Sequence, residues 1–229
     1  MEATKQEITQ KVKGISLRLV LILVLFALVL GVFYYITDEI VLEKETGFDV
    51  KVFQFLSFIK GPAAQNIMLF FTFFGSSWFL LPAYILLSGY FLFFKKQRSQ
   101  SLNVGAVGIS SAGLLFLLKN IFQRPRPAEQ LLKHIANYSY PSGHSFSSFT
   151  FCGIIMYLVW ISNLRKPVKW LCSIGLFVFA TMVALSRVFF HVHYPSDVLA
   201  GFCLSVMWLT ICYVILIKWN VPGRWGSGT

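Results

Sequence analysis

Two histidines and one aspartate are spaced as a reactive imidazole, a carboxylate that orients it and a second imidazole would be. His193 and Asp197 are four residues apart, with Pro195 between them, near the start of an apolar stretch. A carboxylate one helical turn further on can accept a hydrogen bond from an imidazole N–H, which fixes the tautomer and stabilises the imidazolium cation. His144 begins another apolar stretch and can serve as a general acid. The three residues indicate nucleophilic and acid–base chemistry.

Cationic side chains in the same segments suit an anionic substrate. Lys119 and Arg126 are seven residues apart, and Arg187 precedes His193 by six. A guanidinium group offers a planar donor fork that matches phosphate oxygens. In the stretch RPRP the prolines end the preceding helix near residue 123 and favour an extended chain. Arg124 and Arg126 then point to opposite sides, so only one need face the site, and the other can meet lipid headgroups.

The stretch PSGH, residues 141–144, supplies backbone donors. Ser142 is a suitable N-cap for a helix, with Pro141 just before it. The amides of Gly143 and His144 then fall among the unpaired donors of the first turn, which form a ready anion site. An anion cradle, an oriented imidazole and an acid are the parts that phosphoryl transfer without metal requires.

Composition shows what must position these residues. The chain has 229 residues, of which 56% are hydrophobic and 13% charged, whereas a soluble domain carries about 25% charged residues. Its mean hydropathy is +0.69. Several apolar runs exceed the ~20 residues that cross a bilayer. We therefore predict an all-α integral membrane protein with six transmembrane helices, at about 15–35, 77–94, 102–122, 144–162, 168–189 and 195–219.

The segment between the first two spans is expected to hold shorter helices. Residues 48–60 are too short and too charged to span, and they predict an amphipathic interfacial helix. A membrane-edge helix should precede the interruption at Gly75 and Ser76. We predict a single domain over 1–229, with a motif-bearing core at about 102–219. The small, polar residues 226–229 are interpreted as a cloning remnant.

Charge distribution predicts the orientation. The net charge of +11 falls in short basic clusters between apolar runs, which is typical of topology signals and argues against nucleic-acid binding. Four such clusters fall on one side, which we expect to be cytoplasmic together with both termini. The motif segments then face outward, or the periplasm where a second membrane exists. The four cysteines lie inside apolar runs and are read as buried small hydrophobes: Cys152, Cys172, Cys203 and Cys212.

Three motifs together resemble those of the type 2 phosphatidic acid phosphatase (PAP2) superfamily. They are Lys119-x6-Arg126-Pro127, Pro141-Ser142-Gly143-His144 and Ser186-Arg187-x5-His193-x3-Asp197. The chain looks most similar to the bacterial phosphatidylglycerophosphatases B and undecaprenyl pyrophosphate phosphatases. The resemblance implies hydrolysis of a terminal phosphate on a phospholipid or polyprenyl pyrophosphate in the cytoplasmic membrane, with no cofactor and no obligate protein partner.

The resemblance also assigns a role to each residue. His193 would attack phosphorus and form a phosphohistidine, with Asp197 holding its ring. His144 would protonate the departing lipid oxygen and then activate water. The phosphoryl oxygens would be bound by Lys119, Arg126, Ser142, Gly143 and Arg187.

Three alternatives remain from the sequence. His191, His193 and Asp197 resemble a metal-ligand cluster, but the nearby cations would repel a divalent ion, and His191 is read as a supporting or lipid-facing residue. A phosphotransferase would pass the phosphoryl group to an acceptor other than water. A lipid or anion transporter would use the basic cluster to hold cargo, although the two related halves typical of many transporters are not visible.

Overall fold

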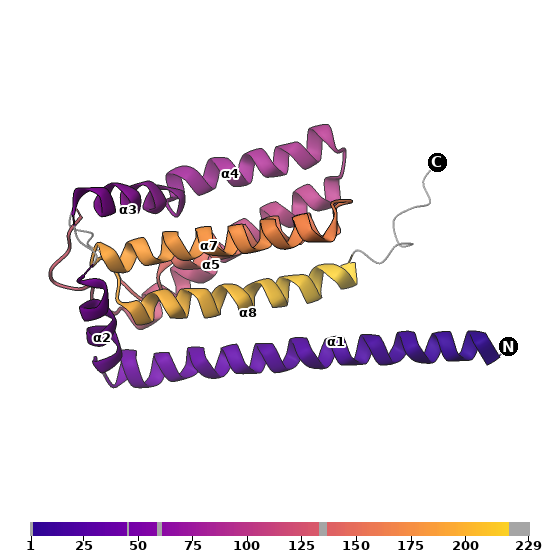
Figure 1. The fold of residues 1–229 in the computed structure, drawn as a ribbon, viewed down its shortest axis with the longest axis horizontal. Helices are drawn as coiled ribbons and strands as arrows, with labels where there is room; N and C mark the ends of the chain where they lie inside the picture. Colours follow the sequence, from indigo (N-terminus) through magenta and orange to yellow (C-terminus); the bar gives the residue numbers. More distant parts are fainter. Residues whose placement is uncertain (1, 45, 59–60, 133–136, 220–229) are drawn as a thin grey trace.

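The computed structural model describes residues 2–44, 46–58, 61–132 and 137–219, and every regular element in this part is helical (Figure 1). The predicted cloning remnant at 226–229 lies outside the described residues. In chain order the elements are α1 (Glu2–Tyr35), η1 (Ile36–Leu42), α2 (Gly47–Leu56), α3 (Pro62–Phe74), α4 (Ser77–Gly89), η2 (Tyr90–Phe94), α5 (Arg98–Phe122), α6 (Gly143–Ile161), α7 (Lys166–Phe189) and α8 (Pro195–Trp219).

The predicted membrane architecture is confirmed. Within the described residues, six helical stretches are long and apolar enough to cross a bilayer: Leu19–Leu42, Ser77–Phe94, Arg98–Phe122, Gly143–Ile161, Lys166–Phe189 and Pro195–Ile215. The shorter helices α2 and α3 occupy the segment between the first two spans, and α3 ends at the predicted break before Gly75. The chain is therefore a multi-pass membrane protein.

The first span is longer than predicted. We expected the first span to end at about residue 35, but the helix continues through the π-helical η1 to Leu42. The cause is a buried face: Ile36, Ile40 and Val41 pack against Tyr140, and Thr37 Oγ1 lies 2.6 Å from the Tyr140 hydroxyl. Acidic residues within η1 concealed this apolar spacing in the sequence.

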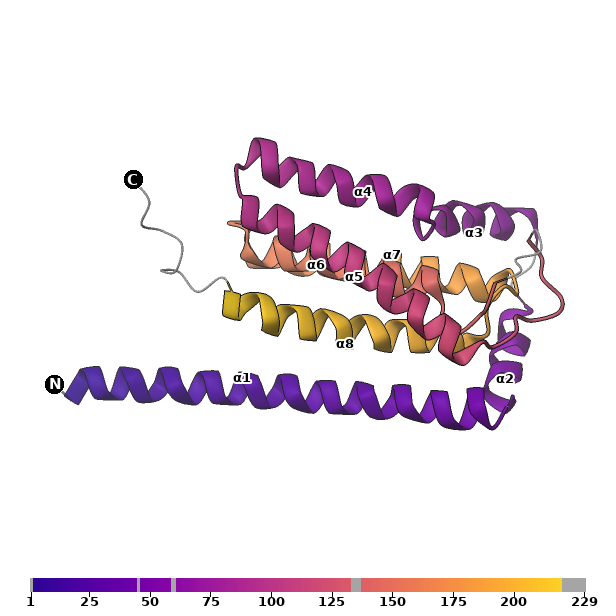
Figure 2. The same ribbon diagram turned by 180° about the vertical axis from the view of Figure 1, so that it is seen from behind.

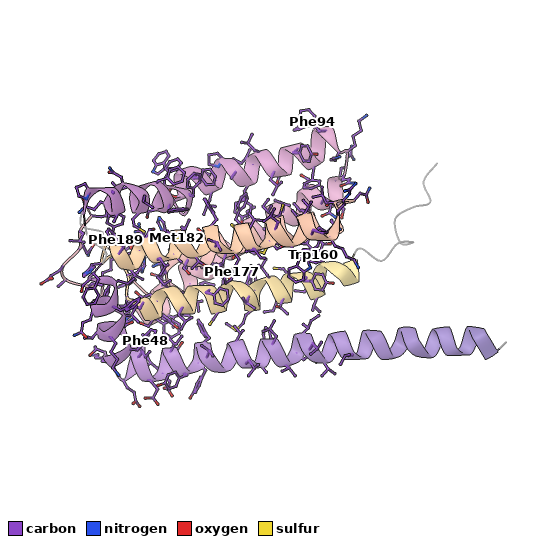
Figure 3. The ribbon with its side chains drawn as sticks, viewed as in Figure 1. Phe48, Phe94, Trp160, Phe177, Met182 and Phe189 are labelled. Atoms are coloured by element: carbon purple, nitrogen blue, oxygen red, sulfur yellow. The ribbon has the colours of Figure 1, made fainter. Side chains whose placement is uncertain are left out.

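The long helices run side by side, and α2 lies across one end of the bundle (Figures 1 and 2). α6 packs against both α7 and α8, α3 packs against α7, and α1 packs against α8. In Figure 3, Phe48 and Phe189 mark the end where α2 lies, whereas Phe94 and Trp160 lie at the opposite end. The motif-bearing segments gather at the α2 end.

The starts of α6 and α8 are joined directly. Ser142 N donates to the Asp197 carbonyl at 3.0 Å, and Ser145 Oγ donates to the Val198 carbonyl at 2.7 Å. Gly201 permits this approach, because a Cβ there would lie 2.8 Å from the Ser142 carbonyl oxygen. The start of α6, which carries the candidate acid, is thus fixed relative to the start of α8, which the candidate nucleophile directly precedes.

Cysteine burial follows the expectation in part. Cys152 and Cys203 are buried, whereas Cys172 and Cys212 are half-buried, and all four are free thiols. They pack as small apolar side chains within the helices.

Candidate active site

The extended RPRP stretch begins where predicted. α5 ends at Phe122, and Gln123 caps it in the left-handed conformation with φ 46°. The two following arginines then diverge: Arg126 lies against His193, and Arg124 pairs with Asp197. Arg124 is 9% exposed, so the expectation that the second arginine can meet headgroups was wrong.

The helix start at PSGH also follows the prediction. Ser142 is the N-cap of α6, and its hydroxyl accepts a hydrogen bond from Ser145 N at 3.4 Å. The residue is fully buried beside α8. The first-turn amides of Gly143 and His144 have no earlier helical carbonyl to bind. They are therefore positioned to serve as donors to an anion.

His193 lies in the short connection between α7 and α8 and is held by the carboxylate of Asp197. Its Nδ1 is 3.4 Å from Asp197 Oδ2, and the same oxygen accepts a hydrogen bond from Tyr194 N at 2.9 Å. Both side chains are buried, with 2% and 0% exposed. Because Nδ1 faces the carboxylate, the tautomer that carries its proton there leaves the Nε2 lone pair to react.

Two predicted phosphate ligands lie near this ring, one of them directly at Nε2. Arg126 Nη1 is 3.1 Å from His193 Nε2, and Arg126 Nε donates to the Asn137 carbonyl at 2.8 Å. Lys119 Nζ donates to the Tyr138 carbonyl at 2.6 Å. Arg126 thus places a cation at the nitrogen that would react, and Lys119 adds a second positive charge to the field at the imidazole.

Arg187 presents an unpaired donor in a buried place. The side chain is 3% exposed, and one of its terminal nitrogens donates to Thr72 Oγ1 of α3. Its Nε is buried and has no hydrogen-bond partner among the described residues. A buried donor without a partner is costly, and a phosphate oxygen would satisfy it. Thr72 thus fixes one end of a guanidinium group whose unpaired Nε can donate to an anion.

His144 faces the same group of charges. It interacts electrostatically with Arg187, His193, Arg126 and Lys119, so all four contribute to the field at its ring. Gly75, directly after α3, makes room for it, because a Cβ at this position would lie 2.7 Å from His144 Cδ2. The two histidines and three cations therefore share one region.

The surroundings of His193 favour the neutral imidazole. Burial, followed by the charges of Arg126, Lys119 and Arg187, lowers the pKa of His193 well below its ordinary value of about 6.5. A neutral ring is the form that can attack an electrophile. The arrangement can thus hold an anion among cations beside an uncharged nucleophile and a second imidazole.

Several contributing residues were not identified from the sequence. Asp49, Thr72 and Gly75 were not considered as site residues. His191, with φ 52°, stacks its ring 4.7 Å from that of Phe53 on α2. Buried side-chain contacts between distant segments leave no periodic signal in a sequence, so Asp49, Thr72 and Gly75 were not detectable, whereas His191 had been interpreted as a supporting or lipid-facing residue.

Comparison with known proteins places the chain among lipid phosphatases. The profile of the PAP2 superfamily matches residues 100–220. The chain is 31% identical to phosphatidylglycerophosphatase B of Bacillus subtilis (strain 168) over 154 residues, which cover 65% of this chain and 73% of that protein. It is 28% identical to undecaprenyl-diphosphatase of Sulfolobus acidocaldarius over 203 residues, which cover 84% of this chain and 88% of the relative.

A solved structure has the same fold. The crystal structure of a transmembrane PAP2-type phosphatidylglycerolphosphate phosphatase from Bacillus subtilis superposes with a TM-score of 0.72. Sequence identity is 27%, and the match covers 86% of this chain and 96% of the other. The similarity thus extends well beyond the three motifs.

Proposed function

This chain belongs to the PAP2 superfamily and is a membrane lipid phosphatase, and we propose that it acts through a phosphohistidine formed on His193. The observation that carries the proposal is the buried, partly unpaired Arg187 guanidinium beside a carboxylate-braced imidazole. The remaining oxygens of the bound phosphate would be held by Lys119, Arg126, Ser142 and Gly143.

The first step transfers the phosphoryl group to the enzyme. Nε2 of His193 attacks phosphorus in line, the N–P bond forms, and the bond from phosphorus to the lipid oxygen breaks. His144 gives its proton to that departing oxygen. Asp197 stabilises the positive charge that develops on the attacking ring, while the cations stabilise charge on the phosphoryl oxygens.

The second step returns the enzyme to its starting state. His144, now unprotonated, takes a proton from water, and the water oxygen attacks phosphorus as the N–P bond breaks. Inorganic phosphate leaves and His193 is neutral again. In this scheme Arg126 must move its donor from Nε2 of His193 to a phosphate oxygen, so substrate binding itself releases the nucleophile.

We expect hydrolysis to persist in EDTA. The positive charge that a metal ion would supply is provided here by Lys119, Arg126 and Arg187. Phosphate release should be measured from detergent-purified protein dialysed against EDTA, with and without added Mg²⁺. A loss of activity in EDTA that a divalent ion restores would contradict a metal-independent mechanism.

The pH dependence of kcat/KM should be bell-shaped, with the acid limb below pH 6.5. His193 must be neutral to attack, and because its pKa is lowered, the reactive form persists as pH falls below 6.5. The alkaline limb reflects loss of the proton from the general acid. The profile should be recorded with two lipids whose phosphates differ in pKa. An acid limb whose midpoint changes with the lipid reports ionisation of the substrate and not of the enzyme. An acid limb above pH 6.5 that is the same with both lipids, or a flat profile from pH 5 to 9, would contradict the assigned roles.

We propose further that the active site faces the outside of the cytoplasmic membrane and that both termini are cytoplasmic. Basic clusters at residues 95–98 and 165–169 lie at the end of the bundle where α1 begins, opposite to α2 (Figure 1). The positive-inside rule assigns such an end to the cytoplasm. Lipids would be the partners, and one domain would carry the whole activity.

The substrate proposal is tested by a phosphate-release panel. Phosphatidylglycerol phosphate, phosphatidic acid, diacylglycerol pyrophosphate and undecaprenyl pyrophosphate each present a terminal phosphate on an apolar tail. Names of the relatives lead us to expect the highest kcat/KM on phosphatidylglycerol phosphate or undecaprenyl pyrophosphate. Release of inorganic phosphate in detergent supports hydrolysis, whereas transfer to an added alcohol indicates a phosphotransferase. Binding of these lipids without turnover would contradict the proposal and favour a transporter.

A further inference from the structure

Helix α2 contributes one carboxylate to the interior, behind the proposed nucleophile. Asp49, in its first turn, is 1% exposed. Its Oδ2 accepts a hydrogen bond from Arg124 Nη2 at 2.9 Å, and Arg124 Nη1 donates to Asp197 Oδ1 at 2.6 Å. The other oxygen of Asp197 lies against His193 Nδ1. A continuous set of buried polar contacts therefore runs from α2 to the imidazole.

The same carboxylate completes the start of α8. Asp197 is the third residue of this helix and accepts a hydrogen bond from Tyr194 N, which is one half of a capping box. Tyr194 lacks the short polar side chain that supplies the other half. Asp49 replaces it, since its Oδ1 accepts from Ser196 N at 2.8 Å and its Oδ2 accepts from Ser196 Oγ at 2.8 Å. Two aspartates from different helices hold the turn that carries the brace of His193.

Arg124 is enclosed by these groups. Its guanidinium carbon lies 4.0 Å from the ring centroid of Tyr194. Burial opposes its charge, yet Asp197 and Asp49 raise the pKa of Arg124 overall. A planar guanidinium group can bridge two carboxylates in fixed directions, whereas an ammonium group cannot. The bridge therefore determines how the Asp197 carboxylate is turned.

We propose that Asp49 and Arg124 are positioning residues for catalysis, holding the Asp197 carboxylate in the orientation that braces His193, so that α2 is part of the catalytic apparatus. The proposal rests on the assignment of His193 as nucleophile. It goes beyond that assignment because neither residue contacts His193 or belongs to the three motifs. α2 is then more than an interfacial helix.

The charges explain why both carboxylates matter. With Arg124 between them, Asp49 and Asp197 leave one net negative charge behind His193. Without Asp49 that charge is neutralised, and the imidazolium that forms during attack is less stabilised. The titratable and charged groups that face this part of the site come from several elements: Lys119, Arg124, Arg126, His144, Arg187, Tyr194 and Asp197.

The test is Asp49→Asn in the full-length, detergent-purified protein. The side-chain oxygen of asparagine can still accept a hydrogen bond from Ser196 N. Asparagine lacks the negative charge, however, and its NH2 group would face the N–H donor of Arg124. We expect kcat to fall about tenfold or more with KM unchanged, since the phosphate-binding groups remain. The acid limb of kcat/KM should move about half a pH unit or more to lower pH.

Two matched variants separate this role from simple anchoring of α2. Ser196→Ala removes a hydroxyl that donates to Asp49 and accepts from Arg124, but it keeps every charge and the direct ion pairs of Arg124 with Asp49 and Asp197, so it should lower the melting temperature without moving the acid limb. Glu43→Gln removes an exposed charge from the same inter-span segment and should behave as wild type. A wild-type kcat and acid limb in Asp49→Asn would overturn the proposal, as would equal pH shifts in Ser196→Ala and Asp49→Asn.

Arg124→Lys keeps the proposal testable where Asp49→Asn does not fold. Lysine preserves the charge but cannot bridge both carboxylates, so kcat should fall about tenfold or more at unchanged KM. A wild-type kcat in Arg124→Lys would overturn the proposal. Wild type and His193→Ala are assayed alongside: an inactive wild type contradicts the proposed function, whereas a normal Asp49→Asn with an inactive His193→Ala contradicts only this inference.

Discussion

Replacing His193 with alanine is expected to lower kcat on lipid phosphates by about 10⁴-fold or more. Without the imidazole there is no group to form the covalent intermediate, and the cations alone can only bind the phosphate. The measurement is phosphate release from mixed micelles, together with acid-labile, base-stable radiolabel on the protein after rapid quenching. Wild type should carry label and His193→Ala should carry none.

The matched control is His191→Asn. This residue lies two positions away in the same connection, and asparagine tolerates its left-handed backbone with φ 52°. Its ring contacts Phe53 and not the reacting groups, so turnover should stay close to that of wild type. Undiminished turnover in His193→Ala would end the proposed mechanism, and loss of turnover in both variants would point to a disrupted connection.

Replacing His144 with alanine is expected to lower kcat on lipid substrates by about 10²- to 10⁴-fold. The lipid oxygen is a poor leaving group and needs a proton as its bond to phosphorus breaks. An aryl phosphate with an acidic phenol does not need that proton, so its first step should be nearly normal. The second step still lacks its base, and the phosphohistidine should accumulate.

The distinguishing measurement on His144→Ala is therefore a burst. With the aryl phosphate, one equivalent of phenol per enzyme should appear rapidly, followed by slow turnover, and the phosphoryl group should remain on His193. Equal losses on lipid and aryl substrates with no burst would show that His144 only supports the fold or binds phosphate.

The membrane helices and the three motifs could be predicted because each leaves a local signal. Apolar runs predicted the spans. Ser142 predicted the start of α6, and the two prolines of RPRP predicted the end of α5. The spacing from His193 to Asp197 predicted that the carboxylate reaches the imidazole, and the two groups do lie 3.4 Å apart, although His193 precedes α8 instead of lying on it. Local geometry was sufficient for all of these.

The supporting contacts could not be predicted because they join segments that are far apart in the chain. Asp49 and Ser196 are separated by 147 positions, and Thr72 and Arg187 by 115. Nothing in the sequence of the polar segment between the first two spans distinguishes Asp49, which is buried, from its exposed neighbours. The extension of the first span through Ile40 was concealed for a related reason, because its buried face is interrupted by acidic residues.

The location of the reacting groups at one end of an apolar bundle has a consequence for how this enzyme meets its substrate. The flanks of the helices expose large apolar side chains, among them Leu28, Phe70, Leu86 and Ile109. A lipid tail can stay in the hydrocarbon while its headgroup reaches the end of the bundle, so nothing has to be extracted into water. Encounter is then diffusion in two dimensions, and the rate follows the mole fraction of lipid within the leaflet rather than its bulk concentration.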